Sequence, residues 1–158
     1  MVRLDNVVIL INCFLAGSPC GQLLLDAEGS ISMKIPFLGA DLKCVWEIRT
    51  VAPTTSRPGH RIILAATDFS IPPFNITEES IVYDGAECPE NNRINVYQDR
   101  YAPGYNLRPG GYCGNNSFQT VISEGNVLYV ELLLSVSVNM ASEFTFLYKT
   151  MPNGKCII

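Results

Sequence analysis

The clearest structural signal in the chain is the stretch Leu42-Lys43-Cys44-Val45-Trp46-Glu47-Ile48-Arg49. Its even-numbered positions all have side chains suited to a core, and charged residues hold most of the odd ones. A period of two is typical of a β-strand with one face on a core and the other toward solvent. Trp46 is the only tryptophan of the chain and falls on the apolar face, so we expect it in the core.

The same alternation recurs on both sides of this stretch. Apolar side chains occupy every second position in five further segments, residues 30–35, 62–66, 94–96, 128–134 and 144–148. Turn-forming residues separate them, at 53–59, 72–73, 89–92 and 109–111. Six or more short strands of this kind predict an all-β fold, a β-sandwich of two sheets. Residues 70–87 and 101–112 lack a clean period, and we expect them to be long loops.

Composition limits the class of protein. The chain has 158 residues, of which 47% are hydrophobic and 16% are charged, so it can bury the core of one domain. Its net charge is −4, and its basic residues are scattered rather than gathered on one segment. Nucleic-acid binding requires a clustered positive face, so we expect no nucleic-acid partner.

The cysteines indicate an oxidising compartment. Six cysteines are present, and none forms the closely spaced Cys or His pairs that a zinc site needs. Two glycosylation sequons begin at Asn75 and Asn115. Together these features predict a secreted or extracellular glycoprotein.

The N-terminus agrees with export. Residues 7–15 form a short apolar run behind Arg3, and small residues follow. We therefore expect residues 1–18 to be a signal peptide; a leading β-strand is the alternative. This run and the apolar residues 127–138 are both too short to span a bilayer, so we expect no membrane span in this chain.

The ordered set of cysteines and strands resembles a CUB domain, the extracellular β-sandwich module of complement and developmental proteases, receptors and spermadhesins. The matching residues are Cys20-Gly21, Cys44-Val45-Trp46-Glu47-Ile48, Cys88, Tyr112-Cys113-Gly114, and the closing strands with Leu128, Val130, Leu132, Phe144, Phe146 and Tyr148. The resemblance covers residues 20–150 and implies a jelly-roll-like sandwich. It also implies two disulfides, Cys20–Cys44 and Cys88–Cys113, whereas the residues alone allow many pairings.

Two cysteines lie outside this framework. If the N-terminus is retained, Cys13 and Cys156 are a possible third pair that joins the ends of the domain. If a signal peptide is removed, Cys156 pairs with another chain or with a missing segment. Residues 151–158 are accordingly a tail or the start of a further segment, and the chain is then a fragment of a longer extracellular protein.

The resemblance also raises the question of calcium. Many CUB domains have a calcium site built from a Tyr, a Glu and two Asp at one end of the sandwich, and calcium prefers such oxygen ligands. At the matching positions this sequence has Phe37, Pro72, Asn91 or Asn92, and Ser135. With all three carboxylates replaced, we expect no metal site and no cofactor.

No catalytic residues are expected. His60 is the only histidine and lies in a loop beside Arg57 and Arg61, and no nucleophile elbow, phosphate loop or zinc-protease motif is present. The resemblance implies a module that binds rather than cuts. We therefore expect a non-catalytic module that binds an extracellular protein partner through loops at the ends of the sandwich.

The candidate contact residues are Tyr101, Tyr105 and Tyr112 in the long loop, because tyrosines are common in binding surfaces. The same tyrosines could instead pack the loop onto its own sandwich. Two other functions stay open, a carbohydrate-binding, spermadhesin-like secreted protein that takes a glycan, and an accessory domain of a secreted protease.

The implied disulfides give a first prediction. Each closes a loop of about 25 residues, and in the chain-entropy model such a crosslink contributes roughly 3.5 kcal/mol to stability. This is a large share of the net stability of a domain, which is about 5–15 kcal/mol. We expect Cys113→Ser to misfold or to fail secretion, measured as secreted yield and melting temperature. Normal yield with an unchanged melting temperature would contradict the implied framework.

Overall fold

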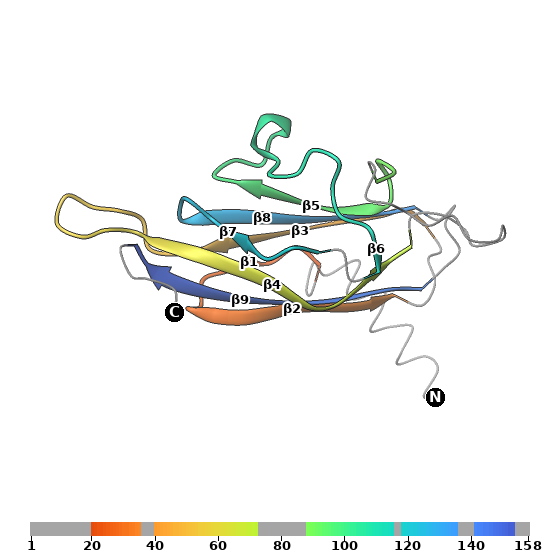
Figure 1. Ribbon diagram of the computed structural model, residues 1–158, viewed down its shortest axis with the longest axis horizontal. Coiled ribbons are helices and arrows are strands. Elements are labelled where there is room, and N and C mark those ends of the chain that lie inside the picture. The colour runs from red at the N-terminus through yellow and green to blue at the C-terminus, as the bar shows by residue number, and fades with distance from the viewer. Residues whose placement is uncertain (1–19, 36–39, 73–87, 116–117, 136–140, 154–158) are drawn as a thin grey trace.

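The computed structural model describes residues 20–35, 40–72, 88–115, 118–135 and 141–153. Two β-sheets face each other in layers, with the hydrophobic core between them (Figure 1). The only helix in these ranges is η1 (Pro103–Tyr105), of three residues, and no helix there is long and apolar enough to cross a membrane. Several predicted features lie outside the described residues, namely the signal peptide, Cys13, Phe37, Asn75 and Cys156.

Sheet A is the upper layer in Figure 1. Its strands follow the order β1-β3-β8-β5, with β1 parallel to β3 and the other pairs antiparallel. Their bounds are β1 (Leu23–Leu24), β3 (Leu42–Arg49), β5 (Arg93–Gln98) and β8 (Val127–Leu134). Strand β3 is the stretch in which the alternation was clearest.

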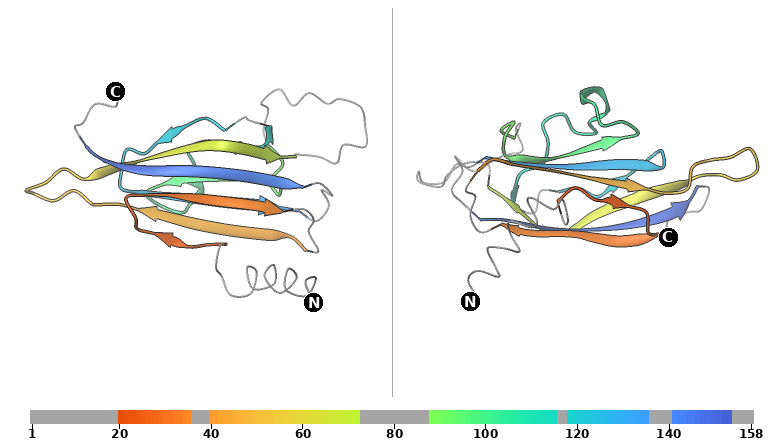
Figure 2. Two further views of the ribbon diagram at one scale, coloured as in Figure 1. Left: turned by 90° about the horizontal axis from the view of Figure 1, so that it is seen from below. Right: turned by 180° about the vertical axis from the view of Figure 1, so that it is seen from behind.

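Sheet B is the lower layer. It has the order β2-β9-β4-β6, and β7 pairs with β4 beside this path. In Figure 2 the blue strand β9 lies between the orange β2 and the yellow β4. The bounds are β2 (Glu28–Ile35), β4 (His60–Ile71), β6 (Gly114–Asn115), β7 (Val121–Ile122) and β9 (Ser142–Pro152). Strand β9 continues through Pro152, so the sheet extends slightly beyond residue 150.

The core follows from the alternation. In β3 the side chains of Cys44, Trp46 and Ile48 are buried between the sheets. Trp46 meets Phe144 of sheet B edge to face, with the ring centroids 6.0 Å apart. The expectation that Trp46 lies in the core is confirmed. Burying such aromatic side chains is the main source of stability in a sandwich of this size.

Strand β4 contains a bulge, after which odd-numbered instead of even-numbered residues face the core. Ile62 and Leu64 point into the core, and beyond a register shift between Ala66 and Asp68 the buried residues are Phe69 and Ile71. One extra residue in the strand moves the apolar set from even to odd positions. The sequence pattern breaks at this bulge, which is why residue 70 marked the start of a loop in the sequence prediction although β4 continues to Ile71.

Two disulfides close the framework. The Cys20–Cys44 disulfide joins the start of the domain to β3. The Cys88–Cys113 disulfide joins the segment that precedes β5 to the residue that precedes β6. The all-β, two-sheet sandwich with two disulfides that the sequence predicted is confirmed.

A glycine in sheet B gives the second prediction. Gly29 pairs with Tyr148 across β2 and β9, and a Cβ built at Gly29 would lie 2.5 Å from the hydroxyl oxygen and 2.7 Å from the ring of this buried tyrosine. We expect Gly29→Ala to lower the free energy of unfolding by about 1–3 kcal/mol, because the ring must shift inside a packed core. Gly104→Ala is the control, since nothing lies within 4 Å of its Cβ position. Equal stability of the two variants in urea denaturation would be the contrary result.

Candidate binding site

Residues 99–112, which we name the tyrosine loop, fold back along the open edge of β5. The Leu107 N–H donates to the Val96 carbonyl at 2.9 Å, and Tyr112 and Ile94 exchange two backbone hydrogen bonds of 2.8 and 2.9 Å. The loop thus pairs with β5 much as an additional strand would, and it lies on the outside of sheet A (Figure 1). Covering an edge in this way prevents pairing with other chains.

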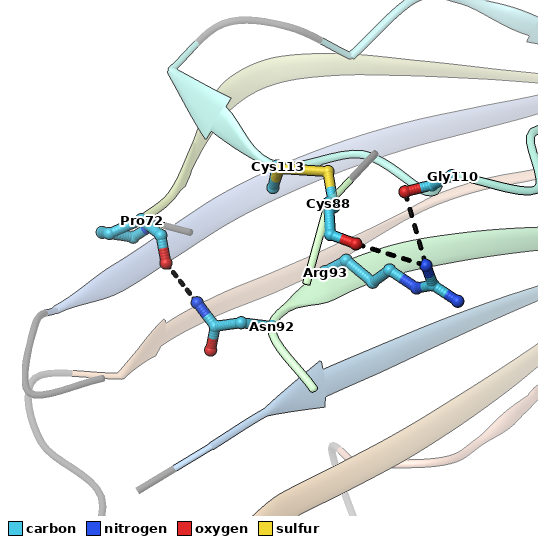
Figure 3. Close-up of a disulfide and its surroundings, with 6 residues drawn as sticks. All are labelled: Pro72, Cys88, Asn92, Arg93, Gly110 and Cys113. Atoms are coloured by element: carbon cyan, nitrogen blue, oxygen red, sulfur yellow. Dashed lines mark hydrogen bonds between the residues drawn. A yellow bond between two sulfur atoms is a disulfide. The ribbon is translucent and has the colours of Figure 1, made fainter. Parts of the chain in front are cut away.

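The return of the loop is fixed beside the Cys88–Cys113 disulfide (Figure 3). The Cys88 N–H donates to the Gly110 carbonyl at 3.0 Å. The Arg93 guanidinium lies 3.5 Å from the carbonyl oxygens of both Cys88 and Gly110. Gly111 has a φ of +70°, and a Cβ there would lie 2.5 Å from the Arg93 side chain, so glycine is required at this close approach.

A buried carboxylate attaches the other end of the loop to sheet A. Glu131 of β8 points away from the core, yet it is buried beneath the loop. It accepts hydrogen bonds from the Asn95 amide at 2.9 Å and the Tyr97 hydroxyl at 3.1 Å. The Tyr101 hydroxyl donates to its second oxygen, and the Lys43 ammonium lies 3.8 Å away. A buried charge is tolerated only when it is paired in this way.

The hydroxyl of Tyr97 stays protonated and can therefore donate a hydrogen bond. Burial raises the pKa of Tyr97 to about 12, and the negative charge of Glu131 and the hydrogen bond to it act in the same direction. The Tyr97 hydroxyl therefore keeps its proton well above physiological pH. The hydrogen bond from Tyr97 to Glu131 is therefore part of the support for the loop at physiological pH.

The structure separates the three predicted tyrosines. Tyr101 and Tyr105 are each 41% exposed, whereas Tyr112 is 6% exposed and packs on Phe118 with the ring centroids 4.5 Å apart. Tyr112 is buried because its backbone pairs with Ile94 and directs its ring toward the core. Tyr112 therefore supports the loop, and Tyr101 and Tyr105 are the two contact candidates that remain exposed.

Positive charges flank the exposed rings. The Lys43 ammonium lies 5.5 Å from the centroid of the Tyr101 ring, and the Arg100 guanidinium lies 5.7 Å from that of Tyr105. Leu107 adds a 43% exposed apolar side chain from the same loop. Sequence reasoning missed Leu107 and both cations. Lys43 comes from β3, and only the fold brings it beside Tyr101, whereas Arg100 and Leu107 are near the tyrosines in the sequence but show their exposure and contacts only in the structure. We name the surface of Tyr101, Tyr105, Leu107, Lys43 and Arg100 the tyrosine surface.

The second sequon lies on sheet B. Asn115 is exposed on β6, and its side-chain oxygen accepts a hydrogen bond of 2.8 Å from the Ser70 hydroxyl. Glycosylation of Asn115 remains a prediction, as does that of Asn75.

The sequence matches no protein-family model. No curated protein matches it by sequence either. The structure is similar to the CUB1-EGF-CUB2 domains of rat MASP-1, with a TM-score of 0.54 and 17% identity over 83% of this chain and 42% of that one. The fold is that of a CUB domain. The corresponding region of human MASP-1/3 gives a TM-score of 0.49 and 14% identity, over 82% of this chain and 41% of that one. The chain thus spans about two fifths of the length of these structures.

The described residues at the position that the CUB resemblance assigns to calcium do not fit a cation. Pro72, Asn92 and Ser135 meet there, and none of them supplies a carboxylate. The Asn92 amide nitrogen donates a hydrogen bond to the Pro72 carbonyl oxygen. A calcium ion would have to coordinate that carbonyl oxygen in place of the hydrogen bond. No group of three His, Cys, Asp or Glu side chains that could hold a metal exists among the described residues.

Glu131 gives the third prediction. We expect Glu131→Ala to lower the free energy of unfolding by about 3–5 kcal/mol, because it leaves Asn95 and Tyr97 buried without their acceptor. Glu143→Ala on sheet B is the matched control, since Glu143 is exposed and its salt bridge to Lys34 spans 4.0 Å. We expect the control to change stability by less than about 1 kcal/mol. Similar losses for both variants in urea denaturation would argue against a tethering role for Glu131.

Proposed function

We propose that this chain is a non-catalytic extracellular module that binds a protein partner through the tyrosine surface. The observation that supports this most is a loop, held on sheet A, that exposes both Tyr105 and Leu107 and places the Arg100 guanidinium over the Tyr105 ring. Tyrosine and arginine are enriched where protein interfaces gain most of their affinity. A loop already fixed by a disulfide and by Glu131 loses little entropy when a partner binds.

The absence of catalysis is part of the proposal. The CUB fold is known as a binding module, and the chain supplies one histidine. His60 begins β4, where its N–H donates to the Val51 carbonyl at 2.8 Å. Its partner across the sheet is Pro152 of β9, and the next residue of the strand is Arg61. Neither offers a nucleophile or a carboxylate. This surrounding supports a structural role for His60.

An extracellular location is part of the proposal, and the two crosslinks support it. Disulfides persist in oxidising compartments, and two of them close this small domain. We propose that residues 1–18 direct secretion and that residues 20–150 contain the module. Because the chain covers less than half of the structures it resembles, a role as one part of a larger secreted protein fits the same observations.

A binding screen with matched variants tests the function and is the fourth prediction. The secreted protein is applied to an array of extracellular protein domains and to a glycan array. We expect a protein ligand whose affinity falls at least about tenfold with Tyr105→Ala or Leu107→Ala, the loss typical of a residue near an interface centre.

Leu147→Ala is the control for this screen. Leu147 is 47% exposed, an exposed fraction similar to the 43% of Leu107. It lies, however, on the outer side of β9 in sheet B. We expect its removal to leave the affinity unchanged. Equal losses for Leu147→Ala and Leu107→Ala would contradict the assigned surface, and specific binding to glycans alone would favour the carbohydrate-binding alternative.

A further inference from the structure

Three chain segments from both sheets meet at one buried side chain. Asn92 lies just before β5 and is 2% exposed. Pro72 directly follows β4 of sheet B, and Ser135 directly follows β8 of sheet A. Figure 3 shows Asn92 pointing to Pro72, near the Cys88–Cys113 disulfide. Asn92 is therefore placed to connect the two sheets where their strands end.

The side-chain amide of Asn92 acts both as a hydrogen-bond donor and as an acceptor. Its nitrogen donates a hydrogen bond to the Pro72 carbonyl, and its oxygen accepts one of 3.2 Å from the Ser135 N–H. Its own backbone N–H donates to the Pro89 carbonyl at 3.1 Å, which fixes the turn that carries the side chain. A carbonyl can only accept and an N–H can only donate, so the two partners determine how the amide is oriented.

Neither of the other two side chains of this size satisfies both partners in its ordinary state. Ionised aspartate accepts hydrogen bonds but cannot donate to Pro72, and leucine can do neither. Burial makes either failure costly, because an unpaired polar group is cut off from water. The site thus requires an amide, and it is asparagine that stands at this position.

The amide occupies the position that the CUB resemblance assigns to calcium ligands. A bound cation would join the ends of these segments by drawing their oxygen atoms to one centre. Here the segments are joined by a hydrogen-bond donor and an acceptor on one neutral side chain. We propose that the Asn92 amide replaces a bound cation as the link between the sheets, so that the stability of this chain is independent of calcium.

Thermal unfolding with two matched variants tests this inference and is the fifth prediction. The melting temperature of the disulfide-intact secreted protein is measured by calorimetry in EDTA and in millimolar calcium, and calcium is also titrated into it. Asn92→Asp removes the donor, whereas Asn91→Asp makes the same change of charge at the exposed neighbour. We expect the melting temperature of the parent protein to be the same in both buffers, with no saturable heat of calcium binding.

In EDTA we expect Asn92→Asp to melt at least about 5 °C below the parent and Asn91→Asp within about 1 °C of it. If Asn92→Asp is not secreted while Asn91→Asp is, this would also support the inference, because it would show a still larger loss of stability. Equal melting temperatures for the two variants would overturn the inference. A calcium-dependent rise in the melting temperature of the parent, or saturable calcium binding, would overturn it as well, whatever the variants do.

Discussion

The open edge of β5 is the constraint on which the rest of the structure depends. A strand at the edge of a sheet exposes unpaired N–H and C=O groups, which invite pairing with other chains. The tyrosine loop pairs with this edge through Leu107 and Tyr112. In doing so it also crosses the outer face of sheet A, where it buries Glu131. The loop is therefore part of the folded sandwich, although its sequence has no strand period.

The way the loop is held decides which of its side chains can meet a partner. The pairing of Tyr112 with Ile94 turns one ring inward, and the bond from Tyr101 to Glu131 directs one hydroxyl inward. Tyr105 and Leu107 lie between these two anchors and remain exposed. The Cys88–Cys113 disulfide closes the loop at its base. Structural support and the proposed binding surface thus come from neighbouring residues of one segment.

Much of the fold could be predicted from the sequence, because strands with one buried face show it directly. The alternation across residues 42–49 gives the bounds of β3, and the apolar stripe at 128–134 gives nearly all of β8. Prediction was poorer where the period changes, as at the bulge of β4, or where a strand has only two residues, as in β6 and β7. The roles of Glu131 and Asn92 could not be predicted, since each depends on partners from distant segments. A buried acid in a strand and an exposed one look the same in the sequence.

Amide hydrogen exchange along residues 99–112 tests the central claim most directly. If the tyrosine loop is a fixed part of sheet A, the amides of Leu107 and Tyr112 exchange slowly, since both are bonded to β5. The exposed turn residues 55 and 56 provide an internal reference for fast exchange. Protection of Leu107 and Tyr112 close to that of the β5 amides is the predicted result. Exchange as fast as that of the turn would show that the loop is not held on the sheet and would contradict the account.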